Sequence, residues 1–176
     1  MKKKVLFIQG IWTKYNFFKN WENYFKELKY EPTFLSFDYY NYRDINKMKI
    51  LTEEITNIIE KEKNLTVVCH SFGGILFNSA LNKSKKHNIK KAIFFACPFK
   101  TNIFGMKKRK RILGYDKNLK YDFENFSFGA YFDHFVPAFT SKYKEEPHKN
   151  FFVDHFYLFA QNKKLYETIF RFCNIK

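Results

Sequence analysis

Apolar positions along the chain form two kinds of pattern, which follow one another in turn. Short, continuous apolar runs predict strands at residues 5–8, 33–37, 65–69, 92–96, 126–131 and 151–153. The run at 65–69 is entirely apolar or β-branched, as expected of a strand that is covered on both faces. Strands that alternate with helical patterns predict a parallel sheet built from right-handed crossovers.

Helical spacing of apolar residues fills most of the intervals between these runs. One apolar face lies between Phe17 and Leu28, and a second runs from 45 to 59 with Asp44 as its predicted N-cap. Helical periodicity resumes at Ser71, and the apolar positions of 158–172 predict a C-terminal helix over the sheet. The stretch 99–124 has no clear period, so we expect irregular structure there.

A short motif follows the third predicted strand directly: His70-Ser71-Phe72-Gly73-Gly74. It fits a nucleophile turn, in which a serine occupies a sharp strand-to-helix corner and small flanking residues let the two backbones approach closely. Gly73 meets that demand, whereas Cys69 is larger than the usual residue two positions before the serine. The alternative is that Ser71 only caps a helix, as serine often does.

An acid and a base follow the serine in chain order. Asp133 comes after the fifth predicted strand and His155 after the sixth, so His155 is the candidate base and Asp133 the acid that orients it. Asp133 as a turn residue and His155 as an interior histidine remain open alternatives. His134 and Asp154 adjoin the favoured residues and compete with them. The remaining histidines are expected to pack at the turn (His70) or to lie in solvent (His87 and His148).

Two backbone N–H groups are candidates for an oxyanion hole. Phe72 follows the serine at the start of a helix, where the helix dipole favours negative charge. The second donor is expected from the loop after the first strand, where Gly10 permits a tight backbone path and Ile11 carries the N–H. Trp12 is a candidate for the substrate pocket, although a simple packing role explains it equally well.

Composition bounds the class of protein. The 176 residues fit one domain, 1–176, and the 45% hydrophobic and 22% aromatic fractions exclude a disordered chain. Three scattered cysteines argue against a disulfide framework and a clustered metal site, and favour the cytoplasm. No apolar run is long enough to cross a bilayer, so no transmembrane segment is expected.

The formal net charge of +15 widens the range of partners to consider. Such a surface attracts polyanions, anionic lipid headgroups or an acidic substrate. Lys, Asn, Phe, Tyr and Ile are all over-used together, which indicates a general compositional bias. Only residues 107–111 form a dense basic block, for which we expect a solvated loop. No nucleic-acid-binding motif accompanies the charge, so nucleic acid is not an expected partner.

Together these motifs resemble the α/β-hydrolase superfamily across nearly the whole chain. The G-H-S-x-G-G motif of that family stands here as residues 69–74, its D-x-x-V-P acid motif as 133–137, and its final histidine and aromatic as His155-Phe156. Gln9-Gly10 departs from the usual His-Gly, and Cys69 from the usual glycine. The compactness is similar to that of small bacterial serine hydrolases, such as retinoblastoma-binding-protein-type hydrolases and minimal lipases.

The resemblance implies both a fold and an activity. The fold is a three-layer α/β/α sandwich with a mostly parallel six-stranded sheet in the order 2-1-3-4-5-6, without the family's first antiparallel pair or large cap domain. The activity is hydrolysis of a small-molecule ester or thioester through an acyl-enzyme on Ser71, with no cofactor or metal. The segment 99–124 is a candidate lid or insertion, suited to an acyl or anionic substrate.

Two rival functions stay open. An amidase or peptidase uses the same triad, because chemistry is not read from fold. A non-catalytic binding protein on the hydrolase fold, using its basic surface, is the rival from a different class. The sequence leaves the oligomeric state open.

Overall fold

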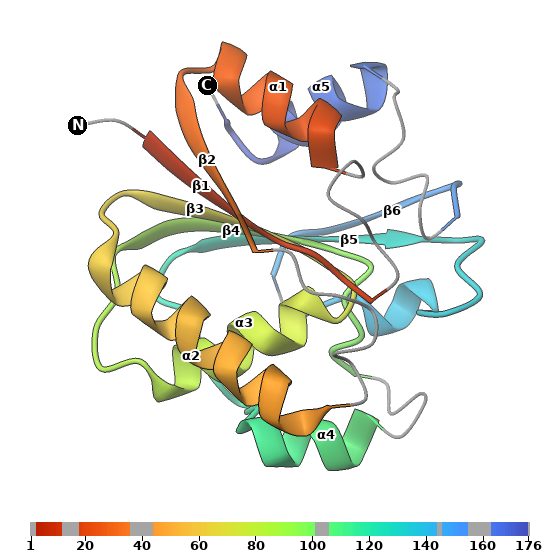
Figure 1. Ribbon diagram of the computed structural model, residues 1–176. Helices are drawn as coiled ribbons and strands as arrows, with labels where there is room; N and C mark the ends of the chain where they lie inside the picture. Colours follow the sequence, from red (N-terminus) through yellow and green to blue (C-terminus); the bar gives the residue numbers. More distant parts are fainter. Residues whose placement is uncertain are drawn as a thin grey trace.

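A computed structural model of the protein describes residues 3–11, 18–35, 44–100, 106–143, 146–154 and 163–175. Its centre is a six-stranded sheet in the order β2-β1-β3-β4-β5-β6 (Figure 1). The strands are β1 (Lys3–Ile8), β2 (Tyr30–Leu35), β3 (Leu65–His70), β4 (Ile89–Phe95), β5 (Glu124–Ala130) and β6 (His148–Phe151). All five strand pairings are parallel, so the carboxyl ends of the strands share one edge of the sheet.

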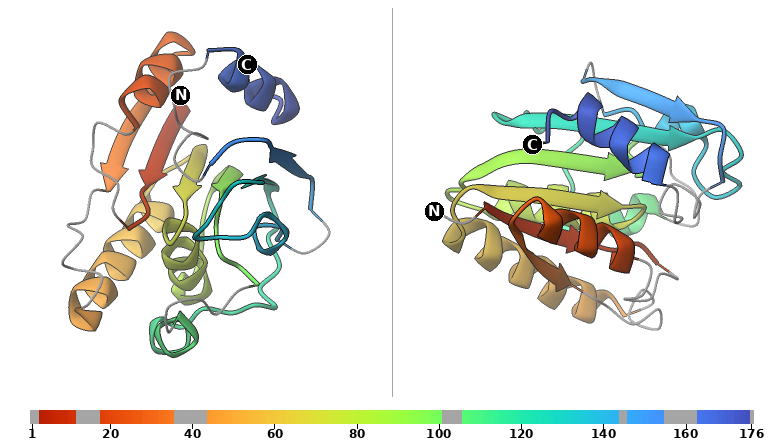
Figure 2. Two further views of the ribbon diagram at one scale, coloured as in Figure 1. Left: turned by 90° about the vertical axis from the view of Figure 1, so that its right-hand side faces the viewer. Right: turned by 90° about the horizontal axis from the view of Figure 1, so that it is seen from above.

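Helices cover both faces of this sheet (Figure 2). On one face lie α1 (Lys19–Glu27) and α5 (Lys163–Phe172), and on the other α2 (Ile45–Lys61), α3 (Gly73–Lys83) and α4 (Met106–Leu113). The three-layer α/β/α fold class and the strand order predicted from the sequence are therefore confirmed. Within the described ranges, no helix is both long enough and apolar enough to cross a membrane.

The two faces of the sheet have separate hydrophobic cores, which follow the alternation of side chains along each strand. In β1, Val5 and Phe7 point into the core under α1 and α5, whereas Leu6 and Ile8 point toward α2 and α3. All four side chains are fully buried. Because β1 and β3 lie inside the sheet, both of their faces are covered, which explains their almost uninterrupted apolar sequences.

Much of the aromatic content of the chain lies in the core under α1 and α5. The ring of Trp21 packs edge-on against Phe95 at 4.9 Å between centroids and lies 5.4 Å from Phe170 on α5. Such aromatic pairs contribute roughly 0.5–1.5 kcal/mol beyond their buried area. Part of the 22% aromatic fraction therefore serves to pack α1 and α5 against the sheet.

The start of α2 is capped as the sequence predicted. The Asp44 carboxylate accepts hydrogen bonds from the backbone N–H groups of Asn46 at 2.9 Å and Lys47 at 3.3 Å. These bonds satisfy two of the helix's unpaired N–H groups.

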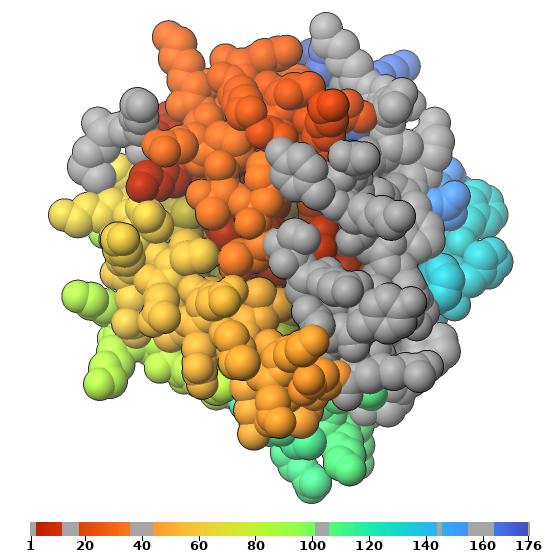
Figure 3. Space-filling view, viewed as in Figure 1, coloured from red at the N-terminus to blue at the C-terminus, as the bar shows by residue number. Residues whose placement is uncertain are grey.

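On the surface, α1 and α2 lie on either side of the edge strand β2 (Figure 3).

The expectation of a solvated loop for the basic block 107–111 was wrong, because those residues belong to α4. Met106, Lys110 and Leu113 recur at helical spacing and form its buried face. Because the charged residue Lys110 occupies one of these buried positions, the sequence shows no helical period of apolar residues there. The role of 99–124 as a lid stays a prediction.

The expectation that His148 lies in solvent was also wrong. His148 is half-buried in β6, where its Nδ1 lies 2.7 Å from the Ser127 hydroxyl on β5 and its Nε2 lies 2.9 Å from the Asn150 side-chain oxygen. Burial lowers the pKa of His148. The histidine therefore joins the last two strands instead of extending from the surface.

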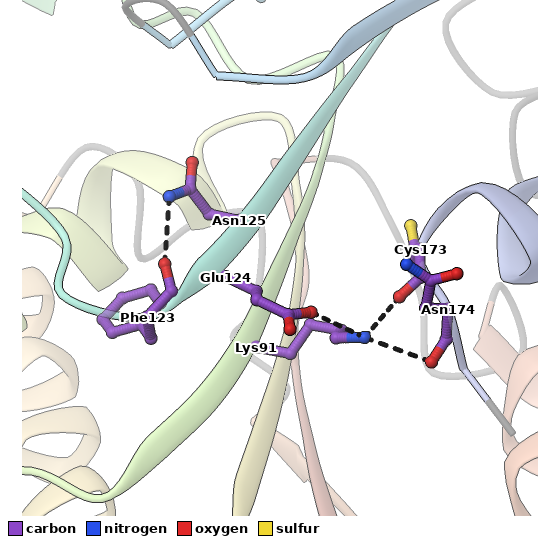
Figure 4. A network of polar contacts seen from close by, with 6 residues as sticks. All are labelled: Lys91, Phe123, Glu124, Asn125, Cys173 and Asn174. Atoms are coloured by element: carbon purple, nitrogen blue, oxygen red, sulfur yellow. Dashed lines mark hydrogen bonds and ion pairs between the residues drawn. The ribbon is translucent and has the colours of Figure 1, made fainter.

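Near the amino end of the interior strand β4, Lys91 holds the chain that follows α5 (Figure 4). Its ammonium group donates to the carbonyl oxygen of Cys173 and to that of Asn174 at 3.3 Å, and forms an ion pair with Glu124 at 3.0 Å. These contacts fix the end of α5 against the centre of the sheet.

Candidate active site

Ser71 stands at a sharp corner between β3 and α3. Its φ angle is +51°, in the left-handed region, where a residue with a side chain is strained by roughly 1–2 kcal/mol. Its backbone N–H donates to the Phe95 carbonyl at 2.8 Å, which ties the corner to the end of β4. Strain of this kind persists only where the surroundings hold it, and it is concentrated at functional sites.

The geometry of Ser71 differs from that of a helix-capping serine. An N-cap residue has an extended backbone, and its side chain accepts a hydrogen bond from the first helical turn. Ser71 has a left-handed backbone, and Phe72 occupies the position before α3. The Ser71 hydroxyl makes no hydrogen bond to any residue that the structure describes. Capping therefore does not account for this serine.

At two positions around the corner, neighbouring atoms lie so close that only glycine fits. A Cβ atom on Gly10 would lie 2.6 Å from the Cβ of Ser71, and one on Gly73 would lie 2.2 Å from the carbonyl oxygen of Ile8. Real Cβ atoms do not approach other atoms so closely, so the end of β1 and the start of α3 can meet only at glycine. These contacts press the loop after β1 against the candidate nucleophile.

Two cysteines lie under the same corner. Cys69, at the end of β3, is fully buried, and so is Cys97, whose Sγ would lie 2.5 Å from a Cβ atom on Gly74. Burial raises the pKa of both thiols. Neither is therefore a thiolate at neutral pH, which leaves the Ser71 hydroxyl as the nucleophile candidate of this corner.

The two candidate oxyanion donors lie on the elements that meet at Gly10. Phe72 is fully buried at the start of α3, where the helix dipole favours negative charge. Ile11 is 7% exposed in the turn after β1, and no described residue accepts a hydrogen bond from its N–H. The pocket candidate Trp12 lies outside the described residues.

Asp133 lies in the turn that follows β5, at the same edge of the sheet as Ser71. One oxygen of its carboxylate accepts from the backbone N–H groups of Phe135 at 2.8 Å and Val136 at 2.6 Å. The side chain is 8% exposed, so its position is fixed by these bonds and by packing. Asp133 therefore stabilises its own turn, and a carboxylate held in this way is well suited to orient a histidine.

The candidate base His155 lies outside the described residues, but the chain just before it is described. The backbone N–H of Phe132 donates to the carbonyl of Val153 at 3.1 Å, so the segment leading to His155 runs beside the Asp133 turn. The competing residues His134 and Asp154 are both exposed. His70 is fully buried, with its ring against Gly10, as expected of a packing residue.

Sequence reasoning missed the support that the end of β4 gives to the site. Ala96, directly after β4, also has a left-handed backbone with a φ angle of +46°, and its N–H donates to the Phe128 carbonyl at 2.8 Å. The Cys97-Pro98 break was the only sequence signal there. No group of three or more His, Cys, Asp or Glu side chains able to hold a metal occurs in the described ranges.

The parallel sheet in the order 2-1-3-4-5-6, with a left-handed serine after β3 and an aspartate turn after β5, has the architecture of the α/β-hydrolase fold. Solved structures confirm this fold. MGS-MChE2, an α/β-hydrolase from a metagenome of lagoon sediments at Mar Chica, Morocco, superposes with a TM-score of 0.72 at 10% identity, over 97% of this chain and 90% of that one.

Two further structures with this likeness have named activities. The RedJ thioesterase of Streptomyces coelicolor has a TM-score of 0.62 at 11% identity, over 96% of this chain and 84% of that one. Esterase B from Lactobacillus rhamnosis has a TM-score of 0.67 at 9% identity, over 99% of this chain and 76% of that one. No family model and no curated protein matches the sequence. These likenesses show a shared fold.

Proposed function

We propose that the protein is a serine hydrolase that cleaves a carboxylic ester or thioester of a small molecule through an acyl-enzyme on Ser71. The observation that carries the proposal is the strained corner at Ser71, with its φ angle of +51° and its hydroxyl unused by the described residues. A strained serine whose hydroxyl makes no hydrogen bond to the described residues is best explained by chemistry that needs this hydroxyl presented at the sheet edge.

In the proposed reaction, the Ser71 oxygen attacks the acyl carbonyl while His155 accepts the hydroxyl proton. The resulting oxyanion accepts hydrogen bonds from the N–H groups of Ile11 and Phe72. The intermediate then collapses, the alcohol or thiol leaves with the proton from His155, and the acyl group stays on Ser71. Water, deprotonated by His155, releases the acid and restores the serine. Asp133 holds the His155 ring in the required orientation.

Labelling with a fluorophosphonate probe tests this proposal, because such probes phosphonylate activated serines. Wild-type protein should be labelled on the peptide that contains Ser71, and Ser71→Ala should not be labelled. The matched control is Ser84→Ala, at the far end of α3, where the hydroxyl only donates to Lys86 and Glu60. This control should be labelled as the wild type is.

The proposal fails if folded wild-type protein remains unlabelled, or if Ser71→Ala is labelled equally well. If labelling depends on Ser71, p-nitrophenyl esters of increasing acyl length and their thioester counterparts define the preferred acyl group. An amide substrate cleaved faster than every ester would replace the ester assignment with the amidase alternative.

A further inference from the structure

A basic pocket lies beside the sheet, on the side covered by α3 and α4. Its volume is about 620 Å³, within the range of small-molecule sites. Six of the nine described residues that line it are cationic, and the other three are aromatic. The cationic residues are Lys100, Lys107, Lys110, Arg111, Lys117 and Lys142, and the aromatic residues are Phe99, Tyr115 and Tyr143.

The pocket is formed by segments that the fold brings together from separate parts of the chain. Phe99 follows β4, and its ring would lie 3.2 Å from a Cβ atom on Gly74, in the first turn of α3. The backbone N–H of Lys100 donates to the Thr140 carbonyl at 3.2 Å, which joins this segment to the chain after β5. The pocket therefore borders the same first helical turn that follows Ser71.

Hydrogen bonds hold the floor of the pocket in place. Lys110 is 7% exposed, and its ammonium donates to the carbonyls of Pro98 at 2.7 Å and Phe99 at 3.1 Å. The same ammonium lies 4.9 Å from the centre of the Tyr115 ring, and the Tyr115 hydroxyl donates to the Phe99 carbonyl at 3.2 Å. Tyr143 is fixed by a 2.5 Å hydrogen bond to the Leu119 carbonyl. The rings are thus positioned before any ligand arrives.

Four of the six cationic residues that line the pocket have no ion-pair partner among the described residues. These four are Lys100, Lys107, Arg111 and Lys117, and no acidic side chain of the described ranges lines the pocket. Like charges gathered in a concave site repel one another and concentrate a positive potential there. A general lysine bias explains scattered surface lysines, but it does not explain six cations around one preformed aromatic cavity.

We propose that this pocket binds a soluble phosphate monoester, with the phosphate among the lysine and arginine side chains and the organic group against the rings of Phe99, Tyr115 and Tyr143. The dianionic phosphate matches the positive charge gathered in the pocket and accepts several charge-assisted hydrogen bonds. The volume of about 620 Å³ and the aromatic walls favour a small molecule over a nucleic-acid chain, which needs an extended groove.

Calorimetric titration with phenyl phosphate tests the proposal directly. The titration is done on Ser71→Ala protein, because binding is then measured without any hydrolase activity. A negative result in this titration can therefore be distinguished from a negative result in the labelling experiment. Phenyl phosphate should bind at one site, more tightly than inorganic phosphate or phenol alone, because only the ester contacts both the cations and the rings. Absence of phenyl phosphate binding at millimolar concentration would overturn the proposal.

Paired charge reversals distinguish a built site from the general positive field. Lys107→Glu with Arg111→Glu changes two exposed pocket residues, whereas Lys85→Glu with Lys86→Glu makes the same change in net charge at exposed positions after α3. The pocket pair should weaken phenyl phosphate binding by about tenfold or more, and the control pair much less. Equal weakening by both pairs contradicts a specific site.

An oligouridine titration covers the nucleic-acid alternative. If the pocket pair weakens RNA binding more than the control pair does, while phenyl phosphate does not compete with the RNA, the pocket belongs to a nucleic-acid surface and the small-molecule proposal is wrong. Displacement of the RNA by phenyl phosphate, or RNA binding that neither pair affects, is the result expected from the proposal.

Discussion

Replacing Gly10 with alanine tests how the candidate active site is held together. The new Cβ atom would lie 2.6 Å from the Cβ of Ser71 and 3.0 Å from Nδ1 of His70, both on the corner that carries the candidate nucleophile. Non-bonded carbon atoms in contact are separated by roughly 3.5–4.0 Å. The loop after β1 and the Ser71 corner must therefore move apart by about 1 Å.

This displacement should have two measurable effects. Crowding in a packed interior costs roughly 1–3 kcal/mol, so the free energy of unfolding from urea titration should fall by that amount. A misplacement of about 1 Å between nucleophile and oxyanion donors costs up to about a hundredfold in rate, so fluorophosphonate labelling should slow by one to two orders of magnitude. The slower labelling should appear at temperatures where the variant is fully folded.

A matched control separates the two effects. Ile59→Val removes one methylene group from a fully buried residue near the end of α2, away from the Ser71 corner, and should cost roughly 0.5–1.5 kcal/mol. This variant should be labelled at the wild-type rate. If Gly10→Ala is as stable as the wild type and is labelled equally fast, the close contact between the β1 loop and Ser71 does not exist as described.

Three further predictions concern other parts of the fold. Asp44→Ala should lower the free energy of unfolding by about 1 kcal/mol through loss of the α2 cap, and an unchanged urea midpoint would contradict the cap. Lys91→Met should cost about 1–2 kcal/mol and speed amide exchange around Cys173, whereas Glu124→Gln, which removes only an exposed ion-pair partner, should have almost no effect. Burial lowers the pKa of Lys110 to about 8, so between pH 8 and 10.5 the unfolded chain holds a proton on this side chain that the folded protein has lost. In urea titrations over that range, the free energy of unfolding of the wild type should therefore rise relative to that of Lys110→Met. A difference between the two proteins that does not change with pH would refute the pKa shift.

The sheet was predictable because its strands are buried on both faces. The apolar run at 65–69 became β3, and the order 2-1-3-4-5-6 followed from the resemblance carried by the serine, aspartate and histidine motifs. Strand ends were less accurate: β6 begins at His148, three residues before the predicted strand. Its polar residues His148 and Asn150 bond to one another, so hydrophobicity gave no sign of their pairing with β5.

The parts that the sequence missed depend on long-range contacts. Lys110 is buried in α4 because the carbonyls of Pro98 and Phe99 accept from its ammonium, and no local pattern identifies such acceptors. The strain at Ser71 was implicit in the predicted nucleophile turn, but the left-handed Ala96 beside it was not. The left-handed backbones of Ser71 and Ala96 are both held by hydrogen bonds to the end of the neighbouring strand, and which strands are neighbours is a property of the assembled sheet.

The position of α5 has a consequence for how the chain reaches its native state. Trp21 and Phe25 on α1 are covered by Phe170, whose ring lies 5.4 Å and 5.1 Å from theirs, so one face of the sheet is completed by a helix made nearly 140 residues later. During synthesis, β1 through β6 emerge before this cover exists. A nascent chain that pauses in between exposes an aromatic surface to its neighbours, which makes protection by chaperones most important in that interval.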